Sequence, residues 1–204
     1  MQRHGRARLL IRMAAILVVG LGVGIATSLL QPELRAPWLS LANAASPWLT
    51  PMFFLGAFRR RPWGAALVGA TTGLLELLGF FAIAAVRGDA SAHSLVLFWV
   101  ACALLGGPIF GLAGWLWWRG PRVLSAFGGA LLPAAFFAEA AVIYGWRLHY
   151  LPSAILFVAV GVGVLLLLGL RGWQHGPIAL WLLVAFPAGV VAELLVGMAY
   201  SQAF

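Results

Sequence analysis

Long apolar runs separated by short polar or basic segments dominate the chain. Charged residues and positions rich in proline and glycine divide it into seven apolar segments: 9–30, 37–58, 62–86, 94–118, 123–144, 153–170 and 177–200. Each has the roughly 17–25 residues that carry an α-helix across a hydrocarbon core of about 30 Å. The pattern predicts an all-α fold, a polytopic transmembrane bundle of seven spans that forms one domain over residues 1–204.

The second apolar segment, 37–58, differs from the others because it is interrupted by polar residues and prolines. Its apolar part, 47–58, is too short to span the membrane alone. Pro47 has no backbone N–H and disfavours helix at Ser46, which frees carbonyl groups one turn earlier. We expect either a broken helix that lines a cavity, or a simple proline kink whose free groups are satisfied by Asn43 and Ser46.

Composition and charge agree with a membrane protein. The chain is 63% hydrophobic and 9% charged, which excludes an ordinary soluble domain. The formal charge of +8 comes from thirteen arginines that lie in short clusters between apolar runs, so nucleic acid is not an expected partner. With the N-terminus inside, three arginines lie outside (Arg35, Arg87 and Arg147) and the other ten inside. This bias predicts a multi-pass protein of the cell membrane with a cytoplasmic N-terminus and an external C-terminus.

The basic N-terminal tail, 1–8, leads into an apolar run that is too long for the core of a cleaved signal peptide. We therefore expect the first segment to be retained as a signal-anchor helix. The single cysteine, Cys102, lies within an apolar run, so no internal disulfide is expected.

Three glutamates, Glu76, Glu139 and Glu193, lie deep within three different apolar segments. A carboxylate at membrane depth costs at least about 2.5–3.5 kcal/mol, so such residues usually have a partner or a function. Counted from the span ends, all three lie in the outer half of the membrane, at about the level reached by Asn43 and Ser46. The sequence therefore predicts a layer that binds a substrate or an ion, with these members: Glu76, Glu139, Glu193, Asn43, Ser46 and Thr72.

Glycines beside the glutamates indicate where helices approach closely. Gly69 and Gly73 share a helix face with Glu76, while Gly189 and Gly197 share one with Glu193. Small residues at this spacing are typical of helix contacts in membranes, so both glutamates are expected to point into the bundle.

Several roles remain open for the glutamates. They could be protonated and hydrogen-bond between helices, or bind a cation, a cationic organic solute or transported protons. The outer arginines could also pair with them by reaching inward.

Enzyme signatures are missing from the chain. The sequence has no metal-spaced histidine or cysteine group, no nucleophile motif and no phosphate-binding glycine loop. We therefore expect no enzyme activity, no catalytic residue, no metal site and no cofactor, and we interpret Asp89, His93 and His149 as solvated loop residues.

Four strings spread over most of the chain resemble a family of small polytopic bacterial membrane proteins of unknown function. They are LANAASPW at 41–48, GGPIFG at 106–111, YGWRLHY at 144–150 and FPAG at 186–189. A looser likeness, through GATTGLLELLG at 69–79 and the glycine-rich stretch at 106–114, is to the substrate-binding membrane subunits of energy-coupling-factor vitamin transporters. That likeness would imply an outward-facing pocket for a vitamin-like solute, with Glu76 in its wall, and cytoplasmic ATPase partners.

Together these features indicate a small transporter or solute-binding subunit with a carboxylate-lined polar layer in the outer half of the membrane. The solute would be a cation, a proton-coupled solute or a small vitamin-like molecule. The alternative is a non-catalytic accessory or assembly subunit that binds other membrane subunits through its glycine faces. In that case the glutamates would serve as interhelical hydrogen-bonding groups.

Overall fold

The structure is a computed structural model that describes residues 2–89 and 92–203, and every regular element in this part of the chain is helical. The elements are α1 (Gln2–Leu30), α2 (Leu39–Ala42), α3 (Ala45–Ala57), α4 (Pro62–Val86), α5 (His93–Arg119), α6 (Arg122–Glu139), the π-helix η1 (Ala140–Arg147), α7 (Leu151–Gly169), the 3₁₀ turn η2 (Arg171–Trp173) and α8 (His175–Ala203).

Six helical stretches in the described chain are long and apolar enough to cross a membrane: Met13–Leu30, Pro62–Val86, His93–Arg119, Arg122–Arg147, Leu151–Gly169 and His175–Gln202. The predicted second span is divided into α2, with 4 residues, and α3, with 13 residues. At 1.5 Å per residue α3 is about 20 Å long, which is short of the hydrocarbon thickness. Six of the seven predicted spans are therefore full-length helices in the described chain, and the second is a broken segment.

The break lies at Asn43 and Ala44 and not at Ser46, where the sequence argument placed it. Ala44 is extended, with φ −107° and ψ 152°, and α3 begins at Ala45. Pro47 therefore falls in the first turn of α3, where backbone N–H groups have no partner within the helix. A proline is tolerated there, so Ser46 can be helical even though a proline follows it.

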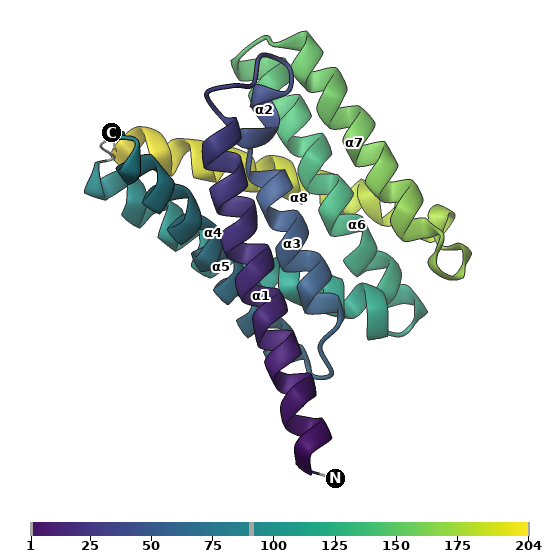
Figure 1. Cartoon of the computed structure of the whole chain (residues 1–204). Helices are drawn as coiled ribbons and strands as arrows, with labels where there is room; N and C mark the ends of the chain where they lie inside the picture. The colour runs from purple at the N-terminus through teal and green to yellow at the C-terminus, as the bar shows by residue number, and fades with distance from the viewer. Residues whose placement is uncertain (1, 90–91, 204) are drawn as a thin grey trace.

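The broken segment lies in the middle of the bundle (Figure 1). Helix α3 packs against α4, α5 and α6. Helices α1 and α5 flank α4 on one side of α3, while α7 and α8 pack on α6 on the other. Figure 1 shows α8 crossing behind the other helices, and the first turns of α1 projecting beyond the bundle. Ala44, at the break, is therefore buried among these helices, whereas Asn43 beside it is exposed.

Glycines allow close contact between the helices around α4. A Cβ at Gly24 of α1 would collide with the backbone of Glu76, and one at Gly69 of α4 would collide with Gly107 of α5. The close approach predicted from the glycines beside Glu76 is confirmed. On α8, Gly189 lies against Ala134 and Ala138 of α6, which confirms the corresponding prediction near Glu193.

Three connections that carry arginine meet at one end of the bundle. Arg119 Nε donates to the carbonyl of Arg59 at 2.6 Å, which joins the end of α5 to the loop before α4. Arg171, after α7, donates to the carbonyl of Trp118 at 2.5 Å, and its guanidinium lies 4.0 Å from the centre of the Trp118 ring. The arginines counted on one side of the membrane are therefore neighbours in space.

The Gly24 contact gives a direct test of the packing of α1 on α4. We expect Gly24→Leu to lower the free energy of unfolding by about 1–3 kcal/mol, because the new side chain would force the two backbones apart. Gly22→Leu, on the same helix with nothing within 4 Å of its Cβ position, is the matched control. Titration with sodium dodecyl sulfate measures both variants, and equal stability of the two would contradict this packing.

Candidate functional site

The N-terminus of α3 is capped by a carboxylate from another helix. Oε1 of Glu139, the last residue of α6, accepts from the Ala45 N–H at 2.8 Å. Oε2 accepts from the Ser46 N–H at 3.0 Å and from the Ser46 hydroxyl at 2.6 Å. Both Glu139 and Ser46 are buried. The carboxylate thus satisfies the donors freed by the break, at the helix end that favours negative charge.

Polar contacts also fix the short helix α2 on the other side of the break. Ser40 Oγ lies 2.7 Å from Ser153 Oγ at the start of α7. The hydroxyl of Tyr144 in η1 donates to the Ser40 carbonyl at 3.0 Å. Because α2 and α3 are held separately, the extended geometry between them is set by tertiary contacts and not by the proline alone.

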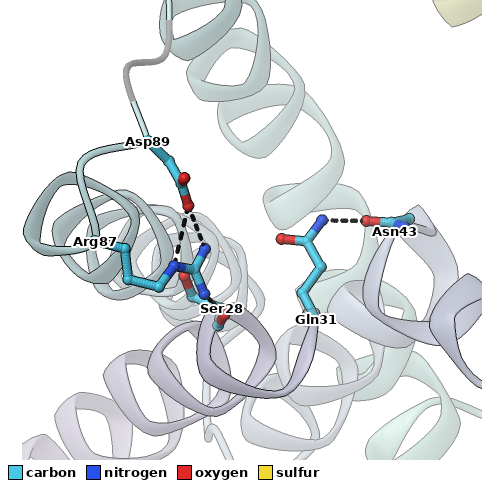
Figure 2. Close-up of polar contacts among 5 residues, drawn as sticks. All are labelled: Ser28, Gln31, Asn43, Arg87 and Asp89. Atoms are coloured by element: carbon cyan, nitrogen blue, oxygen red, sulfur yellow. Dashed lines mark hydrogen bonds and ion pairs between the residues drawn. The ribbon is translucent and has the colours of Figure 1, made fainter. Parts of the chain in front are cut away.

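A third contact ties the break to the end of α1. Gln31 Nε2 donates to Asn43 Oδ1 at 2.6 Å (Figure 2). Nearby, Arg87 pairs with Asp89 at 2.8 Å and donates to the carbonyl of Ser28, so the ends of α1 and α4 are linked as well. Arg87 therefore pairs with Asp89 and does not reach inward to a glutamate.

A cavity of about 420 Å³ lies beside the break. Its volume falls within the range of small-molecule sites. Asn43, at the break, is exposed and Tyr200 is 42% exposed, so both lie near its mouth. The lining residues come from the α1–α2 connection, α2, the break, α3, α4, α5 and α8: Gln31, Ala42, Asn43, Ala44, Ala45, Trp48, Leu77, Phe80, Phe81, Leu95, Trp99 and Tyr200.

Aromatic rings make up much of the cavity wall. Trp48 of α3 and Phe80 of α4 have ring centres 5.6 Å apart, in an edge-on arrangement. Phe98 touches both Trp99 and Tyr200, at 5.2 and 5.5 Å between ring centres, which couples α5 to α8. A smaller cavity of about 70 Å³ adjoins the larger one, and the two share Ala45, Trp48, Leu77 and Trp99 in their linings. The cavity is thus framed by rigid rings.

Glu76 is fully buried on the helix that forms one wall. Neither oxygen of its carboxyl group has a hydrogen-bond partner within the described chain. It lies on the same face of α4 as Gly73 and Phe80, at i−3 and i+4, which line the smaller and the larger cavity. A buried polar group without a partner is costly and marks a place where a ligand or a proton would be stabilising.

Glu193 of α8 lies near Glu139 and Arg147. Glu193 interacts electrostatically with both, and also with Cys102, which lines the smaller cavity. The guanidinium of Arg147, the last residue of η1, lies against Gly197, one turn beyond Glu193. Of the three outer arginines proposed as partners for the glutamates, Arg147 is placed to act in this way.

The structure brings part of the predicted polar layer together. Glu139 and Ser46 are hydrogen-bonded, Glu193 is near them, and Asn43 lies at the break and lines the cavity. Glu76 and Thr72 are buried on α4, where the Thr72 hydroxyl donates to the Val68 carbonyl at 2.8 Å. Binding of a substrate or an ion by these residues stays a prediction.

The sequence analysis missed the aromatic residues of the cavity: Trp48, Phe80, Phe81, Trp99 and Tyr200. They come from four helices, and no spacing along the chain relates them. The sequence offered one indication of them, their closeness along the chain to the predicted polar residues. Trp48 follows Asn43 by five positions, and Phe80 and Phe81 follow Glu76 by four and five.

The long apolar helices and the polar break between them define a multi-pass, all-helical membrane protein. The chain belongs to the family described as a family of unknown function (DUF6518), whose profile matches residues 3–200. The resemblance to a family of uncharacterised membrane proteins is thereby confirmed, whereas no comparison supports the likeness to vitamin-transporter subunits. No curated protein and no solved structure shows a significant match.

The cap predicts how the protein responds to loss of Glu139. We expect Glu139→Ala to lower the free energy of unfolding by about 2 kcal/mol or more, since the N–H groups of Ala45 and Ser46 would remain buried without an acceptor. Glu139→Gln keeps one oxygen acceptor, so its free energy of unfolding should lie between those of Glu139→Ala and the parent. Glu33→Ala, at an exposed position, serves as the control and should change stability by less than about 0.5 kcal/mol. Unchanged or raised stability of Glu139→Ala in detergent unfolding would contradict the cap.

Proposed function

We propose that the protein is a solute-binding membrane protein, a small transporter or the binding subunit of one, and that the solute enters the cavity beside the break between α2 and α3. The protein would bind or move this solute without covalent chemistry. In this proposal the chain lies in the cell membrane, and the cavity opens toward its outer face.

The main support for the proposal is the break between α2 and α3, where the Glu139 carboxylate accepts from the free N–H groups of α3. Non-helical backbone at membrane depth is tolerated where it is buried in protein or lines a cavity. Here the break does both. Asn43 and Ala44 line the cavity of about 420 Å³, and the groups around them are held by Glu139 at Ala45 and Ser46, by Gln31 at the Asn43 side chain and by Tyr144 at Ser40. Discontinuous helices of this kind form solute sites in many transporters.

The accessory-subunit alternative has less support from the packing. It relies on free glycine faces, but Gly24, Gly69 and Gly107 are all occupied by contacts within the chain. Glu139 does act as an interhelical hydrogen-bond acceptor, as that alternative requires. Glu76 and Glu193 are not explained in this way, since neither accepts a hydrogen bond from another helix in the described residues.

We propose the orientation from the arginine distribution. If the broken segment crosses the bilayer as one unit, the chain makes seven crossings, and its two ends lie on opposite sides. The connections that carry Arg59, Arg119 and Arg171 share one end of the bundle, and the positive-inside rule assigns that end to the cytoplasm. The N-terminus is then cytoplasmic, and the break lies toward the outside.

Labelling of single cysteines tests this orientation. In a Cys102→Ser background, we expect His149→Cys to react with a membrane-impermeant maleimide added to intact cells, because His149 follows η1 at the outer end. Gly172→Cys, in the turn after α7, should react only after the membrane is permeabilised. The reverse pattern would contradict the proposed orientation.

Blocking the cavity tests the proposed function. Ala45 is half-buried and lines both cavities, so Ala45→Phe would fill the space without removing the backbone N–H that Glu139 binds. In a thermal-shift screen of purified protein against ions, amines and vitamin-like solutes, we expect compounds that stabilise the parent and fail to stabilise Ala45→Phe. Ala82→Phe, on the exposed face of α4, is the matched control and should respond like the parent.

The outcome of this screen separates the two roles. Hits that stabilise the parent and the Ala45→Phe variant equally would show that the cavity is not the binding site. A folded parent that no compound stabilises would count against solute binding and in favour of an accessory role.

A further inference from the structure

The cavity wall contains no charged side chain among the described residues that line it. Its polar side-chain groups include the amides of Gln31 and Asn43, which bond to each other through Gln31 Nε2 and Asn43 Oδ1, together with the hydroxyl of Tyr200 and the indole N–H groups of Trp48 and Trp99. The remaining wall is largely aromatic, with rings from Trp48, Phe80 and Trp99. The faces of such rings carry negative potential, and cations are attracted to them, most strongly when water is excluded.

The charges just behind this wall are mostly acidic. Glu76 lies on the wall-forming face of α4, buried and without a hydrogen-bond partner. Glu193 acts electrostatically on Cys102 in the adjoining smaller cavity. Arg147 lies against Gly197, one turn beyond Glu193 on α8, and is the basic residue that interacts with Glu193. Two carboxyl groups therefore lie near residues that line the cavities, and neither forms a salt bridge within the described part of the chain.

We propose that the cavity binds a small organic cation, an amine or quaternary ammonium compound, whose charged head rests against the aromatic rings and is balanced by Glu76 and Glu193. The proposal rests on the solute-binding function and names the class of solute. The charged head would meet ring faces in the larger cavity, and the carboxyl groups of buried Glu76 and half-buried Glu193 would supply the opposite charge from behind the wall.

Other classes of solute fit the wall less well. An anion would find no arginine or lysine in the lining and two carboxyl groups behind it. A bare metal ion needs several oxygen ligands, whereas the described side chains of the wall offer only two amides that already bond to each other and the Tyr200 hydroxyl. An uncharged aromatic solute could stack on the rings but would gain nothing from the carboxyl groups. The experiment must therefore separate cation from neutral solute.

Binding of three probes of similar size but different charge tests the inference. Benzyltrimethylammonium is the cation, benzyl alcohol the neutral probe and benzenesulfonate the anion. Each is titrated into the full-length protein in lipid nanodiscs, with empty nanodiscs as the blank, and binding is followed by calorimetry. We expect saturable binding of the cation at least about tenfold tighter than that of either other probe.

Matched variants assign the binding to this site. Trp99→Leu should weaken cation binding by about thirtyfold, which corresponds to about 2 kcal/mol for a cation–π contact shielded from water. Trp63→Leu, at an exposed tryptophan near the start of α4, is the control and should leave the affinity unchanged. Glu76→Gln removes charge without changing size and should weaken the cation by tenfold or more, yet leave benzyl alcohol unaffected. Glu33→Gln, at an exposed position, controls for the loss of one charge.

The results distinguish this inference from the function on which it rests. If benzyl alcohol or benzenesulfonate binds as tightly as the cation and Trp99→Leu weakens it, the cavity is a solute site but the cation assignment is wrong. If the cation binds but Glu76→Gln and Trp99→Leu leave its affinity unchanged, the assignment is also overturned. The absence of saturable cation binding to the folded parent overturns it as well, while the Ala45→Phe screen judges the solute-binding function separately.

Discussion

The structure depends on one carboxylate that satisfies a helix end within the bundle. In a bilayer each unpaired backbone N–H costs free energy that water cannot offset, so a helix that starts at membrane depth requires an acceptor. Glu139 supplies it from α6, and its two oxygens take the N–H groups of Ala45 and Ser46 together with the Ser46 hydroxyl. Without that acceptor the extended stretch at Ala44 would be better replaced by continuous helix, and the space beside it would close.

Around this contact the chain holds the break from three directions. Tyr144 and Ser153 fix α2, Gln31 fixes Asn43, and the glycine contacts of Gly24 and Gly69 bring α1, α4 and α5 close enough to enclose the remaining space. The π-helix η1 follows Glu139 directly and carries both Tyr144 and Arg147. It therefore contributes to the attachment of α2, through Tyr144, and to the environment of Glu193, through Arg147. π-Helical turns are often found at functional sites. The polar groups around the break are therefore linked to one another through shared helices.

The apolar pattern predicted the long helices because hydrocarbon thickness fixes their length, and the cost of a buried carboxylate identified Glu139 as a residue with a partner. The partner itself was not predictable, since Ala45 and Glu139 are 94 positions apart and nothing in local sequence relates them. The proline rule placed the break at Ser46, but Pro47 only permits a helix start in its neighbourhood, and the position at Ala44 is set by Glu139 and Tyr144. Similarly, Trp48, Phe80 and Trp99 form a wall only because α3, α4 and α5 pack as they do.

If the break opens a cavity that water and solutes can reach within the helical bundle, thiol accessibility at Ala45 measures this most directly. In a Cys102→Ser background, Ala45→Cys should react with a small water-soluble methanethiosulfonate reagent, and a bound solute should slow the reaction. Ala82→Cys, on the exposed face of α4 that would meet lipid, should remain unreactive under the same conditions. If Ala45→Cys is as unreactive as Ala82→Cys in the folded protein, the cavity is closed to the aqueous phase and the account is wrong.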